Sequence, residues 1–204
     1  MTNADKVYRF TESRIRYFTE STQDSAVRAS LAELRRGVGS KPGALPQLWG
    51  TFLNEMPEEF FGRNGEPSRA EWAVYTVLTL FALHQQSKDL HTECMDRKDI
   101  SFGRAVGMLV RDENDRDRVA RRFNAAVTAS DMQALVYYAR GLIQLLRAEN
   151  IGLDYPAFAK DLYLWQLSDD SRDAVRLRWG QDFYYRKQDA KEENKETDTS
   201  ESEE

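Results

Sequence analysis

The sequence has few of the residues that support redox or metal chemistry. Among 204 residues there is one cysteine, Cys94, and there are two histidines, His84 and His91. One cysteine cannot form an intramolecular disulfide, and a lone cysteine in a reducing compartment is usually a small apolar side chain. These three residues match no structural zinc spacing, and a fourth ligand is unassigned, so zinc binding is only a minor alternative. We expect no metal ion and no cofactor.

Long apolar runs are also missing from the sequence. No stretch approaches the roughly 20 apolar residues that a membrane helix needs. The first residues include Asp5, Lys6, Arg9 and Glu12, and they lack the apolar core of a signal peptide. We therefore expect a cytoplasmic protein with no membrane partner.

Local signatures of catalysis are not found. The glycines of Gly37-Val38-Gly39 lack the third glycine and the preceding strand of a dinucleotide fingerprint, and no Walker-type loop occurs. No nucleophile with a base and no paired-carboxylate motif is recognisable. The sequence therefore predicts a protein that is not an enzyme.

Helical periodicity is the dominant pattern, and no alternating run predicts a strand. Residues 68–85 open with Ser68 and Glu71 in capping-box spacing and are apolar on all sides, which predicts a helix at the centre of a bundle. Further helices are predicted at 7–18, 25–36, 46–52, 102–110, 115–128 and 131–149, and from Asp154 and Ser168 onward. For 131–149 the expected capping box is Ser130 with Gln133, and the expected core face is Leu135, Tyr138, Ala139, Leu142, Ile143 and Leu146. Core positions are also expected for Trp49, Trp72, Trp165 and Trp179.

Two segments of the chain differ from the rest in their content of charged and polar residues. Residues 89–100 are polar, as in an interdomain linker. Residues 188–204 carry eight acids and two lysines with almost no apolar residue, which predicts a disordered tail. The predicted fold is all-α, with helical bundles over 1–95 and 96–187, a short polar linker and a disordered acidic C-terminal tail. That tail is either a solubilising end or a competitor for a basic face of the protein.

Arginines cluster on predicted helix faces. Residues 97–147 hold ten basic side chains, nine of them arginine, against six acids. Arg118, Arg121 and Arg122 share one arc, opposite the apolar positions of the same helix, and Arg140 with Arg147 and Arg104 with Arg111 are spaced seven apart. A second cluster comprises Arg28, Arg35, Arg36 and Lys41. Guanidinium groups suit phosphate oxygens, although solvated or internally paired faces have the same composition.

A series of short motifs follows a particular order along residues 10–185. They are Leu34-Arg35-Arg36-Gly37, Pro42-Gly43, Pro46 with Leu48-Trp49, residues 80–84, residues 101–105, Arg121-Arg122-Phe123, Leu153-Asp154-Tyr155, Asp161-Leu162 with Trp165, Arg178-Trp179-Gly180 and Phe183-Tyr184. In order and spacing the sequence resembles the CasB family, the small subunit of the type I-E CRISPR Cascade surveillance complex. The acidic tail has no counterpart in that family.

The resemblance implies a function that cannot be inferred from composition alone. A CasB subunit is expected to bind nucleic acid non-specifically and to stabilise the displaced non-target strand of an R-loop. Its expected partners are the backbone and large subunits of Cascade, a second copy of itself and crRNA-guided target DNA. The candidate nucleic-acid-binding residues are Arg35, Arg36, Arg104, Arg121 and Arg122 by motif, and Lys41, Arg118, Arg140 and Arg147 by helical geometry. The alternative is a helical protein–protein adaptor without nucleic-acid contact.

Overall fold

The computed structural model describes the backbone of residues 1–22 and 24–200 and the side chains of 1–22 and 25–185. Its α-helices are α1 (Asn3–Glu20), α2 (Asp24–Arg36), α3 (Trp49–Phe52), α4 (Arg69–His84), α5 (Phe102–Gly107), α6 (Glu113–Val127), α7 (Met132–Ala148), α8 (Tyr155–Trp165) and α9 (Asp169–Ser200), with 3-10 helices η1 (Pro46–Leu48) and η2 (Glu58–Phe60). Within this part of the chain there is no strand beyond two isolated bridges. The all-α prediction is confirmed.

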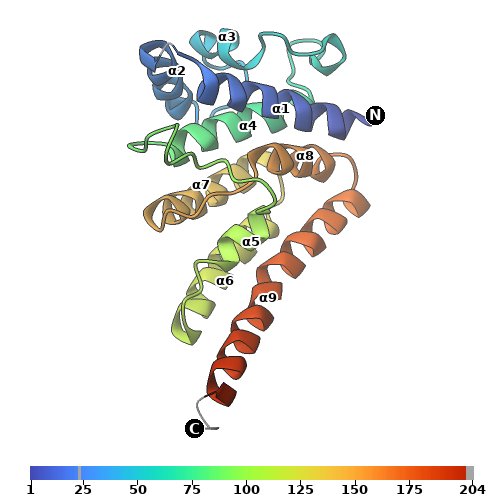
Figure 1. The fold of residues 1–204 in the computed structure, drawn as a ribbon. Helices are drawn as coiled ribbons and strands as arrows, with labels where there is room; N and C mark the ends of the chain where they lie inside the picture. The colour runs from blue at the N-terminus through green and yellow to red at the C-terminus, as the bar shows by residue number, and fades with distance from the viewer. Residues whose placement is uncertain (23, 201–204) are drawn as a thin grey trace.

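The central position of α4 follows from its sequence. Ser68 and Glu71 form the predicted capping box, and nearly every side chain of the helix is buried. Helices α1, α2, α7 and α8 pack around it. In Figure 1, α1 to α4 lie above α7 and α8, with α5, α6 and α9 below.

The two halves of the chain share one hydrophobic core. Helix α8, from the second half, packs on both α1 and α4, and a single cluster of buried side chains runs from Val7 to Phe183. At one end of this contact, Lys160 Nζ lies 2.8 Å from Asp5 Oδ1. The division at residue 95 therefore separates two groups of helices that remain in close contact.

The predicted polar linker is held in place by hydrogen bonds. Arg97 N donates to Leu153 O at 3.0 Å, and Leu153 N donates to Met95 O at 3.1 Å. Upstream, the buried Gln85 side chain accepts from Met95 N at 2.9 Å. Its amide also donates to three carbonyls of residues 88–93. The segment is thus an ordered connection, and residues 95–97 pair in parallel with Leu153.

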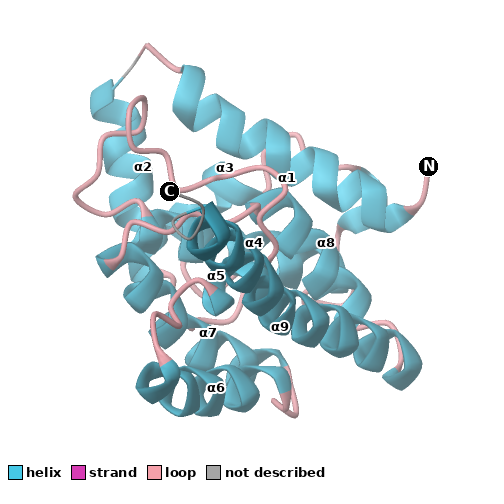
Figure 2. Cartoon of the chain, turned by 60° about the horizontal axis from the view of Figure 1, so that its bottom comes forward, coloured by secondary structure: helices cyan, strands magenta, loops and turns pink. Residues whose placement is uncertain are grey.

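Helix α9 completes the lower layer of helices, together with α5 and α6 (Figure 1). It packs on α5 and α8, and Figure 2 shows it in front of α5. A Cβ built at Gly103 would lie 2.1 Å from Trp179 O, so the two helices approach at a distance that only glycine permits. The helix is continuous to Ser200. Side chains from 186 onward and all of 201–204 lie outside the described residues, so disorder of 188–204 stays a prediction.

Several local predictions were wrong in detail. Helix α7 is capped by Asp131 and not by Ser130, because the Asp131 carboxylate accepts from Ala134 N at 2.8 Å. Helix α5 ends at Gly107 and not at 110, so Arg111 does not extend the face of Arg104. Trp49 is 48% exposed, with its indole N–H donating to Gly43 O at 3.3 Å.

Candidate nucleic-acid interface

A groove between α6 and α7 brings together three of the predicted arginines. Its volume is about 480 Å³, and it is lined by Arg121, Arg122, Ala125, Tyr137, Tyr138, Arg140, Gly141, Leu142 and Gln144. No carboxylate is among these residues. Val119 and Phe123, on the opposite face of α6, are buried, so the predicted orientation of the helix is confirmed.

The arginines of this groove are free of acidic partners among the described side chains. Arg121 Nε donates to the backbone carbonyl of Asp117 at 3.2 Å, while Arg122 and Arg140 are exposed and take part in no ion pair of the described region. Guanidiniums that make no ion pair, in a groove with no carboxylate in its lining, produce a local positive potential. The groove is therefore suited to an anion with several phosphates.

Two exposed tyrosines in the groove were missed by the sequence analysis. Tyr137 is 74% exposed, and Tyr138, predicted to face the core, is 41% exposed. Their rings form an edge-on pair with centroids 5.3 Å apart. The available signal was the spacing of Tyr137, three and seven residues before Arg140 and Gln144, which places it on the polar face of α7.

Arg118 lies in a second, smaller groove that holds carboxylates as well as arginines. Arg118 pairs with Asp115 and Arg111 pairs with Glu149, and both pairs line this groove together with Arg122. The carboxylates partly neutralise the two arginines. Only Arg122 connects this groove to the one between α6 and α7.

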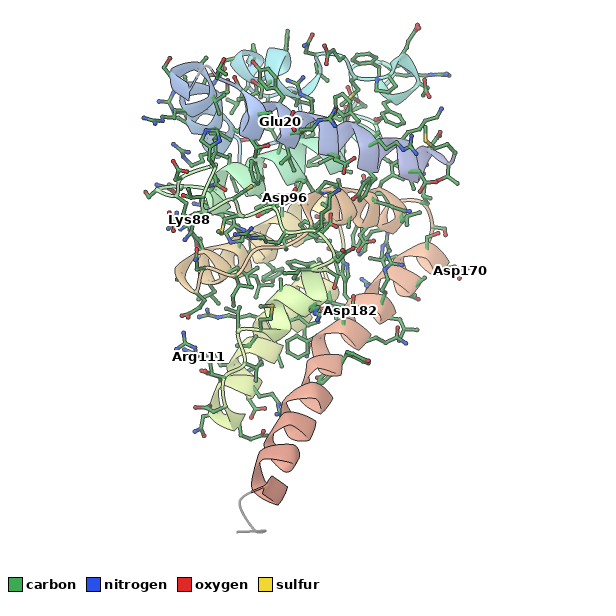
Figure 3. All side chains as sticks on the ribbon, in the orientation of Figure 1. Glu20, Lys88, Asp96, Arg111, Asp170 and Asp182 are labelled. Carbon is green, nitrogen blue, oxygen red and sulfur yellow. The ribbon has the colours of Figure 1, made fainter. Side chains whose placement is uncertain are left out.

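Arg35 and Arg147 come together from opposite halves of the chain. The pKa of Arg35 is lowered by burial and by the nearby Arg147 guanidinium, whose Nη1 donates to Gln86 Oε1 at 2.8 Å. Arg35 also lines a groove between α2 and the 85–91 loop, with Arg28, Lys88 and one carboxylate, that of Asp89. In the view of Figure 3, Lys88 and Arg111 lie on the same side of the molecule. We call Lys88 and Arg111, with the neighbouring Arg28, Arg35 and Arg147, the basic edge.

The remaining predicted residues are not part of this arrangement. Lys41 Nζ lies 2.6 Å from a carboxylate oxygen of Glu66, in an exposed pair. Arg36, at the end of α2, and Arg104, on α5, are exposed and line none of the grooves described here. The structure therefore does not bring these three residues into one site.

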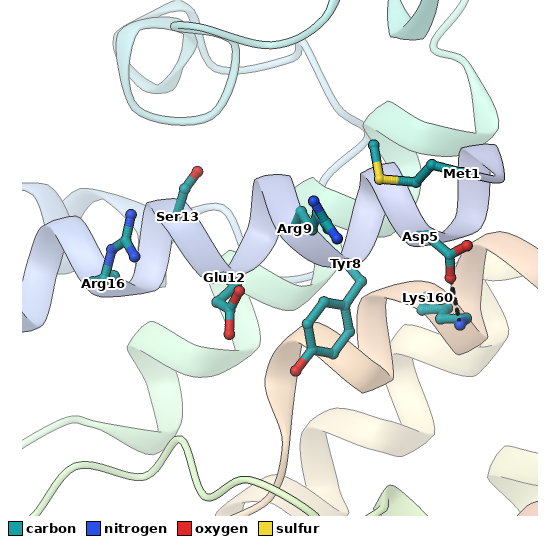
Figure 4. A pocket seen from close by; sticks show the side chains of 8 residues that line it. All are labelled: Met1, Asp5, Tyr8, Arg9, Glu12, Ser13, Arg16 and Lys160. Carbon is teal, nitrogen blue, oxygen red and sulfur yellow. Dashed lines mark hydrogen bonds and ion pairs between the residues drawn. The ribbon is translucent and has the colours of Figure 1, made fainter.

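Another groove, along α1, carries charges of both signs. It is lined by Met1, Asp5, Tyr8, Arg9, Glu12, Ser13, Arg16 and Lys160, as Figure 4 shows. The hydrogen bond from Lys160 holds the pKa of Asp5 well below its usual value, and Glu12 pairs with Lys98 at 3.1 Å. Mixed charge makes this surface a poorer match for a polyanion than the groove between α6 and α7.

The histidines and the cysteine do not form a site. His84 is fully buried, with Nδ1 2.8 Å from the Tyr155 hydroxyl, and burial lowers its pKa to about 4. Burial raises the pKa of the Cys94 thiol. In the described part of the chain no group of three or more His, Cys, Asp or Glu side chains is placed to hold a metal ion. None of the described helices is long and apolar enough to cross a membrane.

Fold and surface together define an all-α protein whose exposed edge carries arginines from α2, α6 and α7. A family model described as CRISPR-associated protein Cse2 matches residues 30–184. The chain belongs to this family, the CasB family of type I-E Cascade. The resemblance stated from the sequence is confirmed.

Solved structures of CasB proteins have the same fold. The Thermobifida fusca protein is 29% identical, with a TM-score of 0.71, over 87% of this chain and 97% of its own. The Thermus thermophilus protein is 20% identical, with a TM-score of 0.61, over 90% and 99%. The M. ruber protein is 24% identical, with a TM-score of 0.59, over 91% and 97%. The comparison with curated proteins finds no match by sequence.

Proposed function

We propose that this chain is a non-catalytic small subunit of a type I-E Cascade in the cytoplasm, which grips nucleic acid non-specifically and stabilises the displaced non-target strand of the R-loop. Its partners are the backbone and large subunits, a second copy of itself and crRNA-guided target DNA. Family membership supports the place in Cascade. The carboxylate-free groove of Arg121, Arg122 and Arg140 is the observation that carries the nucleic-acid contact.

The basic edge extends the surface available to a strand. From the α6–α7 groove it continues through Arg122 to Arg111 and Arg118, each of which is paired with a carboxylate, and Arg147 links it to Arg35 on α2. Guide pairing supplies sequence specificity in such complexes, so a subunit that contacts only backbone phosphates needs no helix that reads bases. Arginines from several helices on one edge meet that requirement.

Salt-dependent binding by the Arg121→Ala/Arg122→Ala variant tests this proposal. Each phosphate contact steepens the fall of log K with log salt by about 0.7 for single strands. We expect the double variant to bind a single strand at least about tenfold more weakly, a loss of roughly 1.4 kcal/mol, with a shallower salt slope. Binding is measured by fluorescence anisotropy with the purified full chain.

A matched variant controls for the loss of two charges. Arg63 and Arg69 are exposed and do not line the α6–α7 groove, so Arg63→Ala/Arg69→Ala is expected to bind as the unmodified chain does. Circular dichroism should show unchanged helicity in both variants, because all four side chains point away from the core. Equal losses in the two variants would show that the α6–α7 groove is not the binding site, and a flat salt response would favour the protein–protein adaptor.

A further inference from the structure

We infer that Tyr137 is a stacking platform for an unpaired base, and that it makes the α6–α7 groove selective for single-stranded nucleic acid over duplex. The inference rests on the proposed function, because the arginines must bring the strand to the ring. It adds an aromatic contact to the phosphate contacts of the same groove.

Exposure of the Tyr137 ring is the first argument. The side chain is 74% exposed although tyrosine is a large, partly apolar residue. Its contact with Tyr138 is edge-on, with the ring planes at 78°, and in such a pair at most one face of one ring is covered, so Tyr138 leaves at least one face of Tyr137 open. Among the described residues the guanidiniums that lie over aromatic rings are Arg14 and Arg172, so no arginine of the groove covers Tyr137.

The surface of α7 beside the Tyr137 ring also lacks a side chain at one position. Gly141 lies one turn after Tyr137, and a Cβ built there would meet nothing within 4 Å. A glycine inside a helix lowers its stability, and no packing requirement in this structure accounts for Gly141. Its effect is to leave open space between Tyr137, Arg140 and Gln144, where the backbone of a bound strand can pass.

The chemistry of the groove favours a nucleic-acid strand over a protein partner. Three arginines and no carboxylate surround the rings, and alternating phosphates and bases are the natural complement of alternating guanidiniums and aromatic faces. Bases stack on aromatic side chains with little dependence on sequence. In a duplex the bases are already stacked and paired, so the Tyr137 ring has no base to receive.

An abasic strand separates stacking from phosphate contact. The full chain is titrated with a labelled oligothymidine, with an abasic oligonucleotide of the same length and charge, and with a duplex. We expect the thymidine strand to bind more tightly than the abasic strand, and Tyr137→Ala to remove that difference by weakening thymidine binding about tenfold. Binding of the abasic strand and the salt slope should not change.

Two variants sharpen the result. Tyr137→Phe keeps the ring and is expected to retain tight binding of thymidine, which distinguishes stacking from a hydrogen bond by the hydroxyl. Tyr185→Ala removes another exposed tyrosine, on α9, and is expected to have no effect.

The possible failures are distinguishable. Equal binding of thymidine and abasic strands by the unmodified chain would overturn the stacking role and leave the proposed function intact. No binding of any strand would overturn both. If Tyr137→Ala leaves strand binding unchanged but lowers the molar mass measured by light scattering, the groove is a contact between copies of the protein.

Discussion

Asp96 is a half-buried carboxyl group in the connection between the two halves of the chain. Its Oδ1 accepts a hydrogen bond from Tyr155 N at 2.9 Å. Burial raises the pKa of Asp96 to about 6, and the nearby Asp154 and Glu12 carboxylates add to the rise. Because its pKa is higher in the folded protein than in the unfolded chain, Asp96 stabilises the fold at pH values below its unfolded pKa. This contribution to the free energy of unfolding is lost as the pH rises through about 6.

Asp96→Asn is expected to stabilise the protein at neutral and alkaline pH. The asparagine carbonyl can still accept from Tyr155 N, and no buried charge remains. At about pH 8 we expect a gain of about 1–3 kcal/mol in the free energy of unfolding, which shrinks below about pH 6 and disappears near pH 4. Urea unfolding of both proteins across this range measures the difference.

An exposed carboxylate provides the control for this pH dependence. Asp170 is exposed on α9, so Asp170→Asn removes one negative charge without removing a buried carboxylate and controls for the change in net charge. His84 has the opposite effect on the pH dependence of stability. Its pKa is lowered to about 4 in the folded protein, so its contribution to the free energy of unfolding is lost as the pH falls below about 6.5. Because both proteins contain His84, it does not affect the comparison. A destabilised Asp96→Asn at alkaline pH would contradict the prediction.

Single-residue exposure was the part of the site that the sequence predicted least well. The buried Leu135, Ala139 and Leu142 were predicted correctly, but Tyr138 borders the apolar stripe of α7, where the neighbouring helix decides its environment. Lys41 was chosen for its charge, yet its partner Glu66 is 25 residues away and is visible only in the fold. Local periodicity contains no information about such contacts.

The contact between α5 and α9 depends on small residues. Gly103 faces the Trp179 carbonyl, and a Cβ at Gly107 would lie 2.8 Å from Phe183 O. Helix boundaries were largely predictable because caps such as Ser68 and Asp154 are local. Close approach between helices is a tertiary property, so helical periodicity did not predict the role of these two glycines.

Gly103→Ala is expected to destabilise the fold. The added Cβ meets backbone atoms of α9, which cannot move aside as a flexible side chain can, and overpacking of this kind costs about 1–3 kcal/mol or more. Gly141→Ala is the matched control, because its Cβ enters open space in a helix interior and should add up to about 1 kcal/mol. Thermal unfolding followed by circular dichroism measures both changes. A Gly103→Ala variant as stable as the unmodified chain would show that α5 and α9 can separate without cost.

At the scale of the whole molecule, the shared core joins the two halves. Residues 1–95 leave the apolar faces of α1 and α4 uncovered without α8, while residues 96–187 lose the helices on which α7 and α8 pack. The division into two bundles stays a prediction about architecture. The contacts between them indicate one cooperative unit.

Separate expression of residues 1–95 and 96–187 tests this cooperativity. We expect the full chain to unfold in one thermal transition and each fragment alone to show none, because each exposes apolar surface that only the other covers. Calorimetry with circular dichroism measures both. A cooperative transition in the 1–95 fragment would show that the first bundle is an independent domain.

The contact of α8 with α1 also affects how the protein folds during translation. Lys160 and Asp5 are 155 residues apart in the chain, so α1 leaves the ribosome long before its partner helix exists. At about 5–20 residues per second the delay is on the order of ten seconds. During that interval the apolar faces of α1 and α4 are open to chaperones, and folding of the first helices is completed only near the end of translation.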